Sequence, residues 1–141
     1  MIRAATHDEI RRISEHMEYA AGRDTRGVVL LEEATVAACV LYDYWTYNAV
    51  QVHVYAPSLK ALFSPPFLRA IFSYPFFEAK RNILYAVTPG DAKGSLAVSG
   101  WLGFKEKYRI KDGWKPGIDM ILKELRREHC RFIPQDVKCA S

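Results

Sequence analysis

Three strand-like segments follow one another between residues 28 and 56, and this run constrains the fold more than any other feature of the sequence. The segments cover residues 28–31, 35–44 and 49–56, and they are rich in apolar, β-branched and aromatic side chains. Such composition is typical of strands, and consecutive strands with short connections favour an antiparallel meander. The run therefore predicts a sheet whose middle is built from neighbouring strands.

Single strands and helices alternate around this run. Further strands are predicted at 2–5, 83–87, 104–110 and 118–125, and helices at 7–21, 64–76 and 91–101, with a helical turn within 126–132. The order predicts an α+β domain with a mixed, mostly antiparallel sheet of about seven strands and helices on both faces. Residues 1–133 would form this single domain, and residues 134–141 a loose C-terminal tail.

Two of the predicted helices carry clear start signals. Thr6 and Glu9 have the spacing of a capping box, in which the Thr6 hydroxyl accepts from the Glu9 amide and the Glu9 carboxylate reaches back. Ser64, followed by proline, suits the cap of the next long helix. Pro75 lies inside that helix and cannot donate to the Ile71 carbonyl, so we expect a kink there.

Charge and composition exclude few classes of function. The 141 residues carry a formal net charge of +4, which suits an anionic ligand and permits nucleic-acid contact. No apolar run approaches the roughly 18 residues that span a membrane, and the N-terminus lacks the order of a signal peptide, so we expect a cytoplasmic protein. Cys39, Cys130 and Cys139 lack metal-ligand spacing, so we expect reduced thiols and no metal site.

His53 is the strongest candidate for a general base. Polar and apolar positions alternate over residues 49–56, which places His53 on the opposite side of the strand from Val52 and Val54. Histidine takes up a proton near neutral pH, so it can serve as a general base. The alternative is a half-buried strand histidine whose ring is satisfied by a neighbour.

Asp43 is the second candidate, at the end of the preceding strand-like segment. Aromatic side chains surround it in the sequence, namely Tyr42, Tyr44, Trp45 and Tyr47. They could line a binding site in which Asp43 attracts a cationic group. The alternative is ordinary aromatic packing between strands.

Five local stretches, taken in order, resemble the GCN5-related N-acetyltransferase (GNAT) superfamily, whose members move an acyl group from coenzyme A to an amine. They are IRAAT before a capped helix, QVHVYAP as the central strand, FLRAIFSYPF as the following helix, WLGFK before the sixth strand and IDMILKELRREHCRF at the end. The pairing of YPF with REHCRF is similar to a subgroup common among phage and prophage genes. The resemblance covers nearly the whole chain.

The resemblance implies that the fourth and fifth strands splay apart and that acetyl-CoA lays its pantetheine arm along the fourth strand, as an added strand would. On this sequence the binding backbone would be that of Val54, Tyr55 and Ala56, and the Val54 or Tyr55 amide would face the carbonyl oxygen. His53 would act as the base, and Asp43 would attract the cationic amine in an acceptor site lined by the neighbouring aromatic side chains.

Two segments depart from the superfamily pattern. Residues 58–66 replace the glycine-rich pyrophosphate loop with two prolines and no glycine, and the expected cofactor contacts there are Lys60, Leu62, Phe63 and Ser64. In the helix before WLGFK, Ala92 and Ser99 stand where the superfamily commonly has an asparagine and an acidic tyrosine. Lys93 is the candidate stand-in for the cofactor contact, and Ser99 for the acid.

Three functions remain open on the sequence. The leading one is an acetyl-CoA-dependent N-acyltransferase for an unidentified amine, with a homodimer as a further expectation. The second is an inactive phage or prophage protein with a structural or binding role, for example in a virion. The third is a small basic nucleic-acid-binding module. The alternating cations of residues 105–111 would share one strand face, for which a solvated face that keeps an edge from pairing is the first interpretation and a nucleic-acid surface the alternative.

Overall fold

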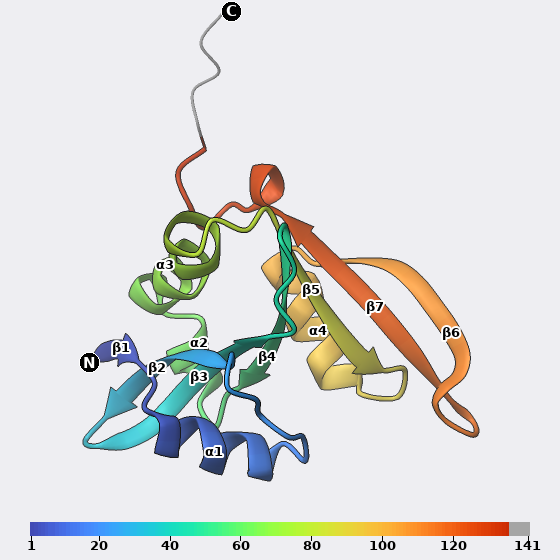
Figure 1. Cartoon of the computed structure of the whole chain (residues 1–141), viewed down its shortest axis with the longest axis horizontal. Coiled ribbons are helices and arrows are strands. Elements are labelled where there is room, and N and C mark those ends of the chain that lie inside the picture. The colour runs from blue at the N-terminus through green and yellow to red at the C-terminus, as the bar shows by residue number, and fades with distance from the viewer. Residues whose placement is uncertain (136–141) are drawn as a thin grey trace, which may run out of the picture.

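The computed structural model describes residues 1–135, which form one seven-stranded sheet in the order β1-β2-β3-β4-β5-β7-β6 (Figure 1). The strands are β1 (Ile2–Ala4), β2 (Arg26–Glu32), β3 (Thr35–Asp43), β4 (Ala49–Tyr55), β5 (Ile83–Pro89), β6 (Lys105–Lys115) and β7 (Ile118–Arg126). The helices are α1 (His7–His16), α2 (Leu59–Leu62), α3 (Pro65–Ser73) and α4 (Lys93–Leu102), with a π-helical turn at Tyr74–Glu78 and a 3-10 turn at Arg127–His129. Neighbouring strands pair antiparallel except β4 and β5, which pair parallel. The predicted fold class is confirmed.

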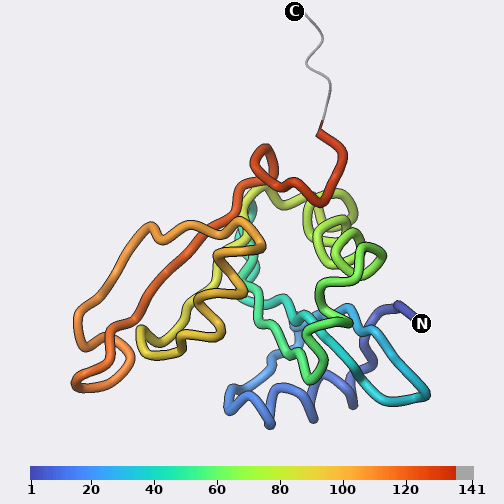
Figure 2. Tube along the Cα trace, turned by 180° about the vertical axis from the view of Figure 1, so that it is seen from behind, coloured from blue at the N-terminus to red at the C-terminus, as the bar shows by residue number. Residues whose placement is uncertain are grey.

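Helices cover both faces of the sheet, as Figures 1 and 2 show from opposite sides. On one face, Ile10 and Ile13 of α1 pack with Leu41 of β3 in a small apolar cluster. On the other face, α3 and α4 contribute to the larger core, in which Phe67 and Leu102 are buried. The alternation predicted for β4 holds, because the valines face the larger core and Tyr55 faces the α1 cluster.

Helix α1 begins as predicted and ends five residues earlier than predicted. The Thr6 hydroxyl accepts from the Glu9 amide, and the Glu9 carboxylate accepts from the Thr6 amide, so the capping box is present. The helix stops at His16, and Glu18 takes a left-handed conformation with φ of 60°. That conformation ends the helical hydrogen-bond pattern, so Tyr19 lies on a loop instead of in the helix.

Pro75 produces a local change of helix type. Where a kinked helix was predicted, the structure has α3 followed directly by the π-helical turn. Pro75 has no backbone N–H group, so it cannot donate to the Ile71 carbonyl. The buried Tyr42 hydroxyl donates to this carbonyl instead. A side chain from β3 therefore completes the hydrogen bonding that the proline interrupts.

The alternating cations of residues 105–111, predicted to share one face of the sixth strand, do not all lie on one face. The pairing of β6 with β7 shifts between Glu106 and Tyr108, so Lys107 is an extra residue in a bulge. Beyond it, Arg109 lies on the face opposite Lys105. The prediction is wrong because a bulge shifts the two-residue alternation by one position.

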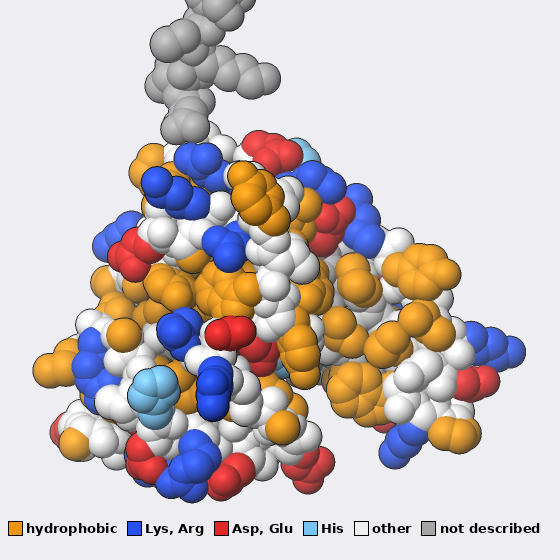
Figure 3. All heavy atoms as spheres, in the orientation of Figure 1, with side chains coloured by type: hydrophobic (Ala, Val, Ile, Leu, Met, Phe, Trp, Pro, Cys, Tyr) orange, Lys and Arg blue, Asp and Glu red, His pale blue; other side chains and the backbone are white. Residues whose placement is uncertain are grey.

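The β6–β7 end of the sheet carries exposed apolar side chains. Tyr108, Ile110 and Trp114 are all more than two-fifths exposed on the edge strand β6. Figure 3 shows hydrophobic side chains gathered on this part of the molecule, beside Lys, Arg, Asp and Glu. The strand is therefore a mixed surface, and charge alone does not define it.

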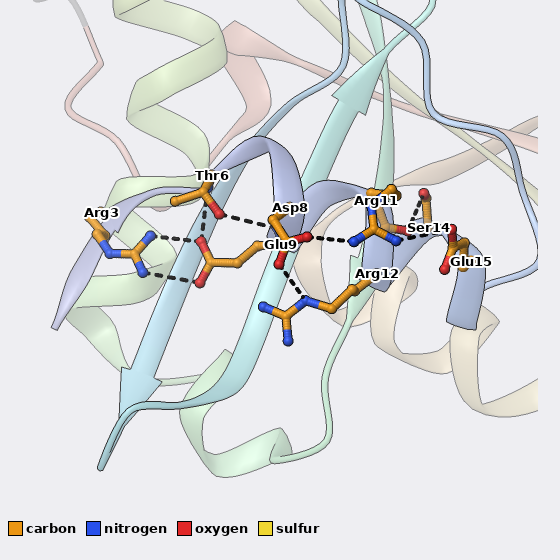
Figure 4. A network of polar contacts seen from close by, with 8 residues as sticks. All are labelled: Arg3, Thr6, Asp8, Glu9, Arg11, Arg12, Ser14 and Glu15. Atoms are coloured by element: carbon orange, nitrogen blue, oxygen red, sulfur yellow. Dashed lines mark hydrogen bonds and ion pairs between the residues drawn. The ribbon is translucent and has the colours of Figure 1, made fainter.

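Glu9 holds the N-terminus of α1 through a network shown in Figure 4. Its carboxylate accepts two hydrogen bonds from the Arg3 guanidinium, at 2.8 and 3.0 Å, and another from the Thr6 amide. These contacts, with Arg3 the largest cause, lower the pKa of Glu9 to about 2. A carboxylate whose pKa is lower in the folded state stabilises the fold above its unfolded pKa.

We expect this stabilisation to disappear as the pH falls from about 4.5 towards 2, at a cost of about 1 to 2 kcal/mol once solvent screening is allowed for. Glu9→Gln should remove the pH-dependent contribution. The measurement is urea unfolding from pH 7 to pH 2.5 for the wild type and the variant, with the exposed Glu15→Gln as a matched control on the same helix. Equal pH slopes for the wild type and Glu9→Gln would contradict the assignment.

Candidate active site

Strands β4 and β5 diverge, which exposes backbone in the middle of the sheet. They pair only from Ala49 to Gln51, against Ile83 to Tyr85. Beyond these residues β4 pairs with β3 and β5 pairs with β7. Within the described chain, residues 52–55 thus lack a ladder partner on the β5 side, and an extended ligand could pair there.

Asp43 and His53 meet on the α1 side of this divergence. In the β3–β4 register Asp43 lies opposite Gln51 and Leu41 lies opposite His53, so the two side chains are diagonal neighbours on one face. The His53 Nε2 atom is 2.9 Å from Asp43 Oδ1, and the side chains are 15% and 7% exposed. An ionised Asp43 can only accept, so Nε2 carries the hydrogen and Nδ1 is left as the proton acceptor.

Tyr19 completes this group, and no sequence signal had indicated it. Its ring stacks on the His53 imidazole with centroids 4.2 Å apart and planes 17° apart. Burial, together with the nearby Asp43 charge, raises the pKa of the Tyr19 phenol, which therefore stays protonated. The residue was expected inside the first helix, and only the early end of α1 brings it over β4.

The aromatic residues around Asp43 do not form one acceptor site. The Tyr42 side chain lies in the larger core, and its hydroxyl donates to the Ile71 carbonyl. Trp45 donates its Nε1–H to the Asp24 carbonyl, and Tyr47 is 97% exposed. Tyr44 contributes its backbone carbonyl, which accepts from Tyr85 at 3.2 Å.

The segment after β4 forms α2, which the sequence did not predict. The Leu62, Phe63 and Ser64 amides donate to the carbonyls of Ser58, Leu59 and Ala61. The Leu62 side chain is fully buried, and the Ser64 hydroxyl donates to the Ala61 carbonyl. These groups are therefore not free anion ligands, and the exposed Lys60 is the remaining candidate in this segment.

The space between α3 and α4 over the diverging strands is largely filled. The cavity there has a volume of about 10 Å³ and is lined by apolar side chains that include Val52, Val54 and Leu102. The Phe63 and Trp101 rings, which do not line this cavity, contact each other with centroids 4.6 Å apart. A pantetheine arm between α3 and α4 would have to displace apolar side chains, because the cavity holds at most about one water.

Ser99 and Lys93 lie away from the Asp43–His53 pair. The Ser99 hydroxyl donates to the Leu96 carbonyl and accepts from the Lys123 ammonium at 3.0 Å. This bond ties α4 to β7, so Ser99 is already engaged in packing. Lys93 is exposed at the first position of α4, and Asp91 does not cap that helix.

Residues 1–135 also bear on metal ligands, membrane-spanning helices and thiols. These residues contain no group of three or more His, Cys, Asp and Glu side chains that could hold a metal ion. None of their helices has the length and apolar character needed to cross a membrane. Cys39 and Cys130 are buried free thiols, and burial raises the pKa of both. Cys139 and most of the predicted tail lie outside the described residues.

The fold is similar to solved N-acetyltransferases. A mutant form of the spermidine/spermine N-acetyltransferase SpeG from Vibrio cholerae superposes with a TM-score of 0.72 at 13% identity, over 91% of this chain and 95% of that one. A GNAT-family protein from Desulfovibrio desulfuricans gives 0.64 at 19% identity, over 86% and 82%. The N-acetyltransferase PseH from Campylobacter jejuni, in complex with acetyl coenzyme A, gives 0.59 at 16% identity, over 85% and 78%.

No protein-family model and no curated protein matches the sequence. At these identities the structural likeness establishes the fold, which is that of the GNAT acetyltransferases. It leaves the phage or prophage subgroup unaddressed.

Proposed function

We propose that this protein is an acyl-CoA-dependent N-acyltransferase that transfers an acetyl group to an amine. The observation that carries the proposal is the Asp43–His53 pair, held at 2.9 Å beside the divergence of β4 and β5. A base oriented by a carboxylate, next to unpaired strand backbone, supplies the two things that amine acylation requires from a protein.

The residues would act in one sequence of proton and bond changes. His53 Nδ1 accepts a proton from the ammonium of the acceptor, while Asp43 stabilises the resulting imidazolium. The free amine then forms a C–N bond to the thioester carbonyl, and the Val54 or Tyr55 amide donates to the carbonyl oxygen. The C–S bond breaks, and the thiolate takes up a proton from solvent, since Ser99 is engaged elsewhere.

Acetyl-CoA would bind along the backbone of Val54, Tyr55 and Ala56, with Lys60 and Lys93 as the candidate partners of its phosphates. Binding would displace apolar side chains that line the small cavity between α3 and α4. The name of the SpeG neighbours makes spermidine the first acceptor to test.

The filled space between α3 and α4 favours a second candidate, a protein of this fold without catalysis. The amides of Leu62, Phe63 and Ser64 point the same way, because they donate to backbone carbonyls and are not available to a pyrophosphate. In that case the Asp43–His53 pair would be a structural contact between strands. A phage or virion role belongs to this candidate.

We expect acetyl-CoA at 100 times its dissociation constant to raise the free energy of unfolding by about 2.7 kcal/mol. Denaturant unfolding with and without the ligand measures this gain, and Lys60→Ala should reduce it, whereas the exposed Lys111→Ala on β6 should not. No stabilisation at millimolar acetyl-CoA would reject the enzyme and favour the second candidate.

A further inference from the structure

The half of the sheet built from β5, β7 and β6 has an apolar face that belongs to neither core cluster of residues 1–135. The register from β3 through β4 to β5 places this face on the α1 side of the sheet. Six side chains, none of them fully buried and none in either cluster, define the uncovered face. They lie in two rows across the strands, which are Val87–Leu122–Tyr108 and Pro89–Met120–Ile110.

The helices of the described chain lie elsewhere. Helix α1 packs against β2 and β3, whereas α4 lies on the opposite face, where the Lys123 ammonium donates to the Leu96 carbonyl and the Ser99 hydroxyl. Figures 1 and 2 show that β6 and β7 extend away from α1, and Figure 3 shows hydrophobic side chains gathered over them. A sheet buries its apolar face against another layer, so the uncovered face lacks the layer that the rest of the sheet has.

Lysines flank the uncovered face at both ends. Lys105 pairs with Glu124 and Lys115 pairs with Ile118, so the two lysines share this face at opposite ends of the apolar rows. Lys107 adds a third cation, with its ammonium 3.6 Å from the Glu124 carboxylate. Strand β6 as a whole carries five Lys or Arg residues and two Asp or Glu residues, a formal charge of +3. The charge therefore favours an acidic occupant.

The size of the uncovered face matches one helix. Three strands span about 14 Å, and residues 118–124 of β7 rise about 20 Å, which gives roughly 300 Å². An α-helix is about 10 to 12 Å wide, and about 13 residues reach 20 Å. A stable interface between two globular proteins buries about 800 Å² on each partner, so this face alone is too small for such an interface.

We propose that the uncovered face binds one amphipathic, acidic α-helix of a partner protein. The apolar side of that helix covers the two rows, and acidic side chains near its ends meet Lys105 and Lys115. A flat membrane fits less well, because α1 projects about 10 Å from the same side of the sheet and its exposed side is charged. A second copy also fits less well, because it brings two positively charged β6 strands together. The proposal is independent of acyl transfer.

The test is fluorescence anisotropy of a labelled synthetic peptide of about 13 residues, with leucine on one helical side and glutamate on the other, titrated with the full chain. Ile110→Ser should weaken binding about five- to tenfold, because an apolar contact is lost, and Lys105→Glu should weaken it about three- to fivefold. Leu59→Ser on α2 and Arg69→Glu on α3, both at exposed positions, are the matched controls and should bind like the wild type. The same peptide with lysine in place of glutamate should bind at least about tenfold more weakly.

Because Ile110 is 41% exposed, Ile110→Ser should keep the wild-type unfolding transition. Wild-type affinity in this variant, equal binding of the acidic and basic peptides, or no binding of the acidic peptide at millimolar protein would overturn the proposal. Two further results would assign the face to another occupant and equally overturn it. One is binding to phosphatidylserine vesicles that Ile110→Ser abolishes, and the other is a dimer in sedimentation that Ile110→Ser dissociates.

Discussion

Replacing His53 with glutamine is expected to lower kcat/KM for amine acetylation by about 100- to 10,000-fold, which is the usual contribution of a positioned general base. Glutamine keeps the side chain polar but cannot take up the ammonium proton. The affinity for acetyl-CoA should stay the same, because His53 would bind no part of that ligand except through the strand backbone. Steady-state acetylation of spermidine, together with acetyl-CoA binding by calorimetry, measures the two quantities.

His16→Gln is the matched control, because His16 lies on the same side of the sheet and its ring contacts Tyr55. It should retain wild-type activity. The pH dependence of activity distinguishes a catalytic His53 from a structural one. The wild type should lose activity as the pH falls and a histidine becomes protonated, and the residual activity of His53→Gln should not show this loss. An unchanged kcat/KM in His53→Gln would remove His53 as the base.

Replacing Leu102 with alanine is expected to destabilise the protein by about 2 to 5 kcal/mol, as for other fully buried leucines. Of the ten residues of α4, all within the described chain, Leu102 alone is buried. It also lines the small apolar cavity between α3 and α4, so its removal enlarges a space that the surrounding strands cannot easily close. The helix that covers β5 and β7 would lose its main apolar anchor.

Equilibrium urea unfolding measures this loss. Leu59→Ala is the control, since the same side chain is removed where it is 53% exposed, and the change should stay within about 0.5 kcal/mol. A loss below about 1 kcal/mol in Leu102→Ala would show that α4 is held by other contacts, such as the Lys123 bonds to Ser99 and Leu96.

Periodicity and turn chemistry predicted most elements of the fold, because these signals act between near neighbours. The capping box at Thr6 and Glu9 is as expected, and so are the seven strands in their order along the chain. The end of α1, the helix α2 and the bulge at Lys107 were not predicted. Each of these depends on how a segment packs against distant residues, which alternation along a single strand does not encode.

The residues of the candidate site differ in the same way in how far the sequence indicated their roles. His53 and Asp43 were recognisable as residue types suited to amine chemistry, ten positions apart on neighbouring strand segments. Leu62, Phe63, Ser64 and Ser99 were chosen by resemblance, and the structure shows that their amides or hydroxyls are already engaged. Hydrogen bonds within short helices are set by local geometry that the superfamily pattern does not determine.

The sequence by itself determined a mixed sheet with helices on both faces, and it placed a basic and an acidic side chain on adjacent strands. Only the tertiary structure decided that they touch, because the β3–β4 register makes Asp43 and His53 diagonal neighbours. It also decided that Tyr19 covers them, since α1 ends at His16 and the chain turns back over β4. Contacts of this kind are fixed by pairing and packing between segments far apart in the chain, where no local pattern records them.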